Sequence, residues 1–246
     1  MKATDLSLTV LDDGASRPDL AMRRELKFVF PGQDVATLRR LLMGACRPIR
    51  YAGPVSTVRS VYFDDPTLRN ARNNLAGVGL RQKTRLRWYD NESPTRRFML
   101  EVKWRRHRFT GKHRLHLECS RPPGETSYRN LLARLRRDSP ALYQHRLAQD
   151  TEAVVLVEYR REHFAVRAGH TRITLDYDLR FFPQMGRSRF TRRFGELLLG
   201  VVIIEVKSAA GDEVSLPGFL APLRVRASRF SKYVIGCQRL GYLKAQ

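Results

Sequence analysis

Basic side chains recur at every second position in residues 80–88, which read Leu-Arg-Gln-Lys-Thr-Arg-Leu-Arg-Trp. Successive side chains of a β-strand point to opposite faces, so all four cations of this segment would share one face. They are Arg81, Lys83, Arg85 and Arg87. Like charges this close repel one another, and such a face is destabilising unless water or a polyanion screens it. The spacing therefore indicates a surface that binds a strongly anionic ligand.

Four other segments alternate in the same way and carry mainly cations with a few acidic residues. For any single strand, such a pattern is most simply a face turned to solvent. A solvated face normally mixes charges of both signs, however, whereas arginine and lysine dominate here. The charged positions are Glu101, Lys103 and Arg105; Lys112, Arg114, His116 and Glu118; Arg172, Thr174, Asp176 and Asp178; and Glu205 and Lys207.

Closure of such a sheet would place the charged faces in a lumen and the apolar faces against flanking helices. The lumen would hold a chain of phosphates, with a divalent metal ion carried on the glutamates. Phosphoryl transfer needs little more than cations around the equatorial phosphate oxygens and a metal ion at the leaving group. These residue types and spacings are therefore suited to binding and transferring phosphoryl groups.

The composition excludes several classes of protein. The chain has 246 residues, with 46 basic and 24 acidic side chains and a net charge of +22, while its 42% hydrophobic content is ordinary for a folded body. We find no apolar run long enough to span a bilayer and no secretory signal. Three widely spaced cysteines, Cys46, Cys119 and Cys237, argue against a disulfide scaffold. We therefore expect a cytoplasmic protein with a strongly anionic partner.

Motifs of the familiar nucleotide-binding and metal-binding folds are absent. The sequence contains no GxxxxGK[ST], GxGxxG or HExxH motif, and its six histidines lack the spacing of metal ligands. The basic residues are not accompanied by an RNP-type or zinc-finger motif, so nucleic acid is not the expected partner.

Period-two patterns outnumber helical ones along the chain. They predict about eight strands, at residues 23–30, 58–63, 80–88, 98–105, 112–118, 153–161, 172–178 and 201–207. Helices are expected after a cap at Asp34 and over residues 125–137 and 228–240. We expect one domain over residues 21–243 after a loosely ordered leader over residues 1–20. The predicted fold class is α+β, an antiparallel β tunnel or barrel with flanking helices.

Eight short motifs occur in a fixed order along this domain: RELKF at 24–28, VYFDD at 61–65, RLRWY at 85–89, LEVK at 100–103, EYRR at 158–161, RITLD at 172–176, IEVK at 204–207 and FSKY at 230–233. Together they resemble the VTC domain, the polyphosphate polymerase branch of the triphosphate tunnel metalloenzyme superfamily. The resemblance implies a tunnel that binds triphosphate or polyphosphate. It also implies transfer of the γ-phosphate of ATP to a growing polyphosphate chain, with Mn²⁺ or Mg²⁺ as cofactor.

The same resemblance assigns roles to residues of these motifs. The implied catalytic set is Lys27, Arg85, Arg87, Lys103, Arg161, Arg172, Glu205 and Lys232. Glu205 would hold the metal ion, with Glu25 and Glu101 as helpers. Tyr159 and Ser231 would bind substrate, as would Arg229, which stands where the resemblance leads us to expect a lysine. The alternation adds Arg81, Lys83, Lys112, Arg114 and Lys207 to the substrate-binding set.

One departure from the pattern of related hydrolases bears on the reaction. Those enzymes carry an ExExK strand, and here its first glutamate is replaced by Arg23, which favours one metal ion and transfer over hydrolysis. The alternatives are a tunnel triphosphatase that hydrolyses inorganic triphosphate or nucleoside triphosphates, and a non-catalytic module that binds polyphosphate or nucleic acid. Coupling of synthesis to membrane translocation would need a separate membrane partner.

Overall fold

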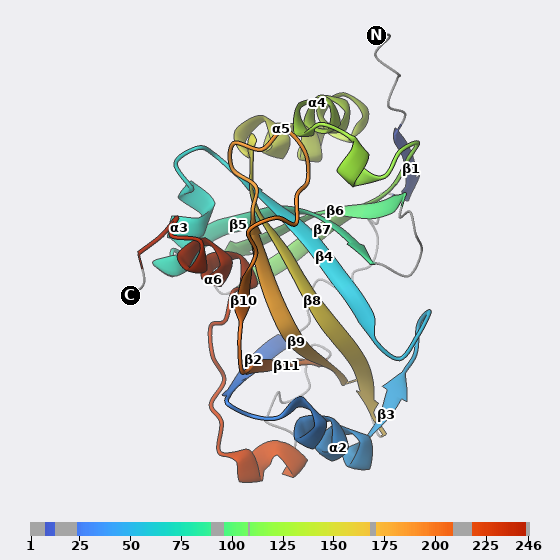
Figure 1. Cartoon of the computed structure of the whole chain (residues 1–246), viewed down its shortest axis with the longest axis vertical. Helices are drawn as coiled ribbons and strands as arrows, with labels where there is room; N and C mark the ends of the chain where they lie inside the picture. The colour runs from blue at the N-terminus through green and yellow to red at the C-terminus, as the bar shows by residue number, and fades with distance from the viewer. Residues whose placement is uncertain are drawn as a thin grey trace.

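A computed structural model describes residues 8–12, 24–89, 96–107, 109–167, 171–208 and 218–244. Eleven strands form one antiparallel sheet, with helices packed around it (Figure 1). The strands are β1 (Leu8–Asp12), β2 (Arg24–Pro31), β3 (Cys46–Ile49), β4 (Ser56–Asp64), β5 (Leu80–Tyr89), β6 (Arg97–Arg106), β7 (Phe109–Cys119), β8 (Glu152–Val166), β9 (Arg172–Pro183), β10 (Glu196–Leu198) and β11 (Val201–Ser208). The helices are α2 (Val35–Ala45), α3 (Arg69–Leu75), α4 (Tyr128–Asp138), α5 (Ala141–Gln149) and α6 (Lys232–Arg239), with 3₁₀ turns η1 (Pro123–Glu125) and η2 (Gly218–Leu223).

The strand order is β1-β7-β6-β5-β4-β8-β9-β11-β2, with β10 added beside β9 and β3 beside β8. All eight strands expected from the alternation are present, and β1, β3 and β10 are additional. Helix α2 begins after Asp34, whose carboxylate accepts the Thr37 backbone N–H at 3.0 Å, as the sequence predicted. Helices α4 and α6 begin later than expected, after the caps Ser127 and Ser231.

The predicted closed tunnel of about eight strands is wrong in two respects. The sheet has 11 strands, and within the described residues no ladder joins its two ends, β1 and β2. Other segments cover both edges that closure would need. Strand β1 pairs along the outer edge of β7, with Leu8 opposite Cys119. On the outer edge of β2, Ala227 bridges Phe28 and the Ser228 N–H donates to the Lys27 carbonyl at 2.8 Å.

Strand β1 also bears on the domain boundary, because it lies inside residues 1–20, the segment expected to be a loosely ordered leader. The rest of that segment lies outside the described residues, as does Arg23. The expected span of one domain over residues 21–243 stays a prediction.

Two groups of helices cover the outer face of the sheet (Figure 1). The apolar side chains of that face are buried against these helices. At one end α4 and α5 cover β5, β6 and β7, where Leu131 and Leu147 pack with Leu100 in one core cluster. At the other end α2 covers β2, β9 and β11, with Leu38 and Leu42 fully buried in a second cluster. Among the described residues, no helix is long and apolar enough to cross a membrane.

Helix α6 packs on the opposite face of the sheet, together with α3. The Tyr233 ring stacks on Tyr62 with ring centroids 4.8 Å apart. Gly236 lies so close to β9 that a Cβ there would sit 2.8 Å from Phe181 Cδ1, so only glycine allows this approach. The helix therefore occupies part of this face and limits how far the charged side chains beside it extend.

Two buried aspartates fasten α3 and α6 to the strands. Asp64, at the end of β4, accepts the backbone N–H groups of Asn70 and Ala71 at 3.0 and 2.9 Å and the Tyr233 hydroxyl at 2.7 Å. Asp150 follows α5 and accepts the Asn70 side-chain amide at 2.7 Å as well as the Thr84 hydroxyl. Burial raises the pKa of Asp150 to about 6, and the neighbouring Asp64 carboxylate contributes to the increase.

Asp150 should make stability depend on pH in a direction opposite to that of paired carboxylates. Between about pH 4, its unfolded pKa, and about pH 6, the folded protein keeps a proton that the unfolded chain has lost. Wild-type stability therefore falls as pH rises through this window. In Asp150→Asn this contribution is absent, so the variant should gain about 2–3 kcal/mol relative to wild type between about pH 4 and 7. Urea unfolding of both proteins across this range measures the difference, and a constant difference would contradict the assignment.

Candidate functional site

Strand register brings the predicted cations onto one face of the sheet. Arg87 lies opposite Ser60, and Arg85 lies opposite both Tyr62 and Glu101. Glu101 in turn lies opposite Arg114. On the other half of the sheet, the same face carries Lys27, Glu205, Thr174, Asp176 and Arg161 in adjoining strands. We call this surface, which β2, β11, β9, β8, β4, β5, β6 and β7 share, the charged face.

The first cluster on the charged face surrounds Glu101, which is fully buried. Arg85 Nε donates to its carboxylate at 2.6 Å, and Arg114 Nη2 lies 3.0 Å away. Lys112 and Arg87 complete the group at 3.8 and 3.9 Å. Burial alone would raise the pKa of Glu101, but the surrounding arginines and Lys112 hold it well below its ordinary value. One carboxylate is therefore shared among four cations.

A second cluster of the same composition surrounds Glu205. Its carboxylate lies 3.2 Å from Lys207, 3.3 Å from Arg161, 3.5 Å from Lys232 and 3.8 Å from Lys27. Burial again opposes ionisation, and the lysines together with Arg161 outweigh it, so the pKa of Glu205 is well below its ordinary value. Again one buried carboxylate has four cationic neighbours.

Asp176 belongs to this second cluster, although it was not among the site residues predicted from the sequence. Both its oxygens accept from Arg161, each at 2.6 Å, and one also accepts from Lys232 at 2.6 Å. The alternation that placed Asp176 on the face of Arg172 was a signal that could have found it. Its role is to fix Arg161 and Lys232, two of the four cations around Glu205, and a bidentate pair holds the Arg161 guanidinium in one orientation.

Aromatic and hydroxyl groups orient the buried arginines of the first cluster. Arg85 donates to the Tyr62 hydroxyl at 2.9 Å, and Arg87 donates to Ser60 Oγ at 3.0 Å and to the Tyr159 hydroxyl at 3.2 Å. The ring of Tyr159 also lies 4.6 Å from the ammonium of Lys232, which links the two clusters. Tyr159 was predicted to bind substrate; Tyr62 and Ser60 were not singled out.

Three lysines show that the charged face holds more positive charge than its carboxylates offset. Burial, with the nearby Lys27, Arg81 and Arg85, lowers the pKa of Lys83 to about 7. Burial and Arg114 lower the pKa of Lys112 to about 8 against the effect of Glu101. Glu25 favours the charged form of Lys103, but burial together with Arg85 and Lys27 holds its pKa well below the ordinary value.

The effect of Glu25 on the pKa of Lys103 also indicates how the sheet is curved. Glu25 is on β2 and Lys103 on β6, far apart in the strand order, yet their charges are close enough to interact. The sheet therefore curls around the charged face without closing.

The remaining predicted residues lie at the boundary of the charged face. Lys83 donates to Ser231 Oγ at 2.9 Å, so the first residue before α6 contacts the strand opposite. Arg81 donates to the carbonyls of Gly77 and Val78 instead. Arg229 is exposed, as is Arg172, which lies opposite Lys207 in the register; neither makes an ion pair within the described part of the chain. The structure thus brings most of the predicted set together and leaves these three arginines at its border.

The three predicted metal ligands fall into two places. Glu25 and Glu205 both pair with Lys27, at 3.2 and 3.8 Å, and both lie within 4.0 Å of Lys207. Glu101 is held by a different set of cations. Across the described ranges, no group of three or more histidine, cysteine, aspartate or glutamate side chains could hold a metal ion.

The fold and this face define the class of protein: an α+β chain whose antiparallel sheet carries a dense cluster of cations on one side. Residues 22–241 match the family model described as the VTC domain, so the chain belongs to the VTC domain family. The resemblance inferred from the eight motifs is confirmed by this match.

Comparison with curated proteins found no match. Among solved structures, the chain is similar to a candidate adenylate cyclase from Vibrio parahaemolyticus, with a TM-score of 0.46 and 13% identity over 86% of this chain and 97% of that one. It is also similar to a candidate adenylyl cyclase from Hippeastrum described as having a dominant triphosphatase activity, with a TM-score of 0.43 and 14% identity over 87% and 95% of the two chains. These scores are too low for either activity to be transferred to this chain.

Removal of the charge at Glu101 should destabilise the protein and make it dependent on added anions. In Glu101→Gln the buried Arg85 and Arg87 lose their compensating carboxylate, and we expect a loss of about 3–5 kcal/mol in the free energy of unfolding. Tripolyphosphate should restore more stability to the variant than to wild type. Thermal unfolding with and without tripolyphosphate measures both effects. Equal stability of variant and wild type would contradict the shared-carboxylate arrangement.

The lowered lysine pKa values predict that polyanion binding takes up protons. At about pH 8, Lys83 is mostly neutral and Lys112 is partly so, and a bound phosphate chain would raise both pKa values. Calorimetric titration of tripolyphosphate in buffers of different ionisation enthalpy measures the uptake. Lys83→Met should take up fewer protons than the control Lys244→Met, which alters an exposed lysine near the C-terminal end of the described residues. Equal uptake in the two variants would refute the assignment.

Proposed function

We propose that the protein is a polyphosphate polymerase that transfers the γ-phosphoryl group of ATP to the end of a polyphosphate chain bound on the charged face. The observation that carries this proposal is the excess of cations on the charged face. Glu101 and Glu205 each have four cationic neighbours. The pKa of the nearby Lys83 is lowered to about 7, so this lysine is partly deprotonated at neutral pH. A ligand with many closely spaced negative charges would offset the positive charge of such a surface. Membership of the VTC domain family supports the same choice of ligand.

Two kinds of cation would divide the work on the charged face. Arg85, Arg87 and Arg161 are held in fixed orientations by hydroxyl groups and carboxylates, so they would position phosphates with little reorganisation. Lys83 and Lys112, whose pKa values are lowered to about 7 and about 8, would become fully protonated when the ligand binds and neutralise part of its charge. Stabilisation of the charge that develops on the transferred group would come from these pre-arranged cations.

Glu205, with Glu25 beside it, would hold the Mn²⁺ or Mg²⁺ ion. Carboxylate oxygens are the ligands that these ions prefer, and one or two carboxylates suffice when phosphate oxygens complete the coordination. The two carboxylates are near enough to share one ion, because both lie within 4.0 Å of Lys27 and of Lys207, with Glu205 buried and Glu25 partly exposed. The two lysines would pair with the phosphates that accompany the ion. When bound, the ion would polarise phosphate oxygens at the leaving group.

The transfer itself would need no covalent intermediate on the enzyme. A terminal oxygen of the polyphosphate chain attacks the γ-phosphorus of ATP, and the bond from that phosphorus to the bridging oxygen breaks. ADP leaves with the bonding electron pair, and the chain is one phosphate longer. The role of the charged face is to hold both reactants in line and offset their mutual repulsion.

The direct test is to incubate the purified protein with ATP and Mn²⁺ and to separate the products on a gel stained for polyphosphate. Parallel reactions contain EDTA or a short polyphosphate primer. We expect a metal-dependent ladder with matching release of ADP. Free phosphate without a ladder would replace this proposal with hydrolysis, and tight polyphosphate binding without turnover would replace it with a binding module.

Glu205→Gln should abolish turnover while affinity for tripolyphosphate is retained or increased, because the carboxylate would serve the metal ion and its loss leaves four cations with less compensation. The matched control is Glu162→Gln, which also breaks a buried ion pair on the same sheet. Glu162 lies on the outer face, where Arg39 donates to it at 2.9 Å. Both variants are compared with wild type by gel assay, tripolyphosphate calorimetry and thermal unfolding. An active Glu205→Gln protein would disprove the metal assignment.

A further inference from the structure

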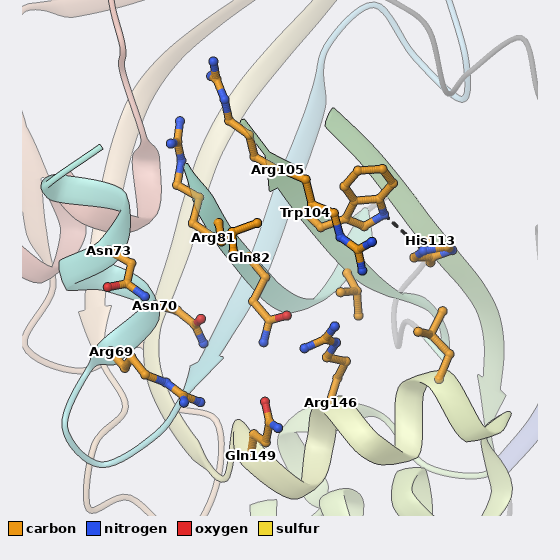
Figure 2. Close-up of a pocket in the computed structure, with 14 residues that line it drawn as sticks. Arg69, Asn70, Asn73, Arg81, Gln82, Trp104, Arg105, His113, Arg146 and Gln149 are labelled. Atoms are coloured by element: carbon orange, nitrogen blue, oxygen red, sulfur yellow. Dashed lines mark hydrogen bonds between the residues drawn. The ribbon is translucent and has the colours of Figure 1, made fainter. Parts of the chain in front are cut away.

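A cavity of about 490 Å³ lies on the outer face of β5, β6 and β7, away from the charged face. Figure 2 shows it between these strands and helices α3 and α5. Gln82, Val102 and Trp104 line it, whereas the residues that alternate with them, Lys83, Glu101 and Lys103, belong to the charged face. Its volume is within the range of small-molecule sites. The sheet therefore lies between most of this cavity and the charged face, and of the lining residues only Arg81 and Arg105 are at positions that alternate onto the charged face.

Five arginines surround the cavity, and no aspartate or glutamate of the described chain lines it. Arg69 pairs with Asp65 at 3.1 Å, but the others have weaker partners. Arg105 donates to the His107 carbonyl at 2.6 Å. The Nε of Arg146 is buried and has no hydrogen-bond partner within the described residues, which is costly unless a ligand supplies one. The lining arginines are Arg69, Arg81, Arg105, Arg106 and Arg146.

Trp104 forms a fixed aromatic surface beside these cations. Its indole lies directly against Gly111 of the neighbouring strand, in space that any larger residue would fill. Its Nε1–H donates to Nε2 of His113 at 3.1 Å (Figure 2), and burial together with Arg146 lowers the pKa of His113, which keeps that nitrogen an acceptor. The guanidinium of Arg106 lies 5.8 Å from the ring centroid. An aromatic ring next to arginines is suited to a base and a phosphate together.

Side-chain amides complete the lining. Gln82 points into the cavity toward Arg146 and Gln149, and Asn73 lies on the side of α3 (Figure 2). Amide groups donate and accept hydrogen bonds, as the edge of a nucleobase and the hydroxyls of a ribose require. An inorganic phosphate alone would leave both the amides and Trp104 unused.

We propose that this cavity is a second ligand site, which binds a nucleotide independently of the phosphate chain on the charged face. The base stacks on Trp104, the amides contact the base or ribose, and the phosphate pairs with Arg146 and with Arg106, which lies beside Trp104. This assignment does not depend on the reaction proposed above, because it concerns binding on the other side of the sheet.

Tryptophan fluorescence with AMP as the probe tests the site without turnover. The chain has two tryptophans, and Trp88 is buried in the core with Phe190, so quenching by a base would report on Trp104. We expect AMP to quench wild type and not Trp104→Phe. Calorimetry should show at least tenfold weaker AMP binding in Arg146→Gln, whereas Arg129→Gln, an exposed change on α4, should bind normally. Thermal unfolding confirms that each variant is folded.

The independence of the two sites is tested with Lys103→Met and with competing ligands. Lys103→Met should weaken tripolyphosphate binding and leave AMP binding unchanged. Adenosine and orthophosphate should each bind more weakly than AMP, because each supplies only half of the contacts. Loss of AMP binding in Lys103→Met, normal binding in Arg146→Gln, displacement of AMP by an equal concentration of orthophosphate, or no AMP binding to wild type would each overturn the proposal.

Discussion

The charged face depends on two buried carboxylates that each hold four cations. Neither Glu101 nor Glu205 could be buried alone, because an isolated ion loses several kcal/mol of hydration. The arginines depend on the carboxylates in turn. Buried arginines such as Arg85 and Arg161 would repel the cations beside them if Glu101 and Glu205 did not offset their charge. The arrangement is nevertheless incomplete, as the lowered pKa values of the surrounding lysines indicate. The charged face of the folded protein therefore carries positive charge that its own carboxylates do not offset, and a bound polyanion would offset it.

Strand register and the curvature of the sheet bring these carboxylates and cations together. Antiparallel pairing sets Glu101 opposite Arg85 and Arg114, cations on both neighbouring strands. It sets Glu205 opposite Lys27 on β2, while Arg161 of β8 approaches Glu205 from beyond β9. A slip of one residue in any of these ladders would turn the charges into the apolar core on the outer face. The penalty for such a slip helps explain why a sheet bearing so many like charges has a single arrangement.

The sequence predicted the strands and their faces because alternation is a local property that follows from strand geometry. It did not predict closure correctly, because the pairing of β1 with β7 and of Ala227 with Phe28 depends on which distant segment reaches each edge. Asp176 had the right position in the alternation, but its bidentate contact with Arg161 follows from pairing between strands. The junction at Asp64 was missed for the same reason, since its partners lie on two separate helices.

Strand β5 contributes side chains to two different environments, because successive residues of a strand point to opposite faces of the sheet. Lys83 and Arg85 contribute to the charged face, whereas Gln82 lines the outer cavity and Thr84 donates to the buried Asp150. Since adjacent residues point to opposite sides, a substitution at one position can alter one environment with little direct contact to the other. The backbone position of the strand is therefore constrained from both sides at once.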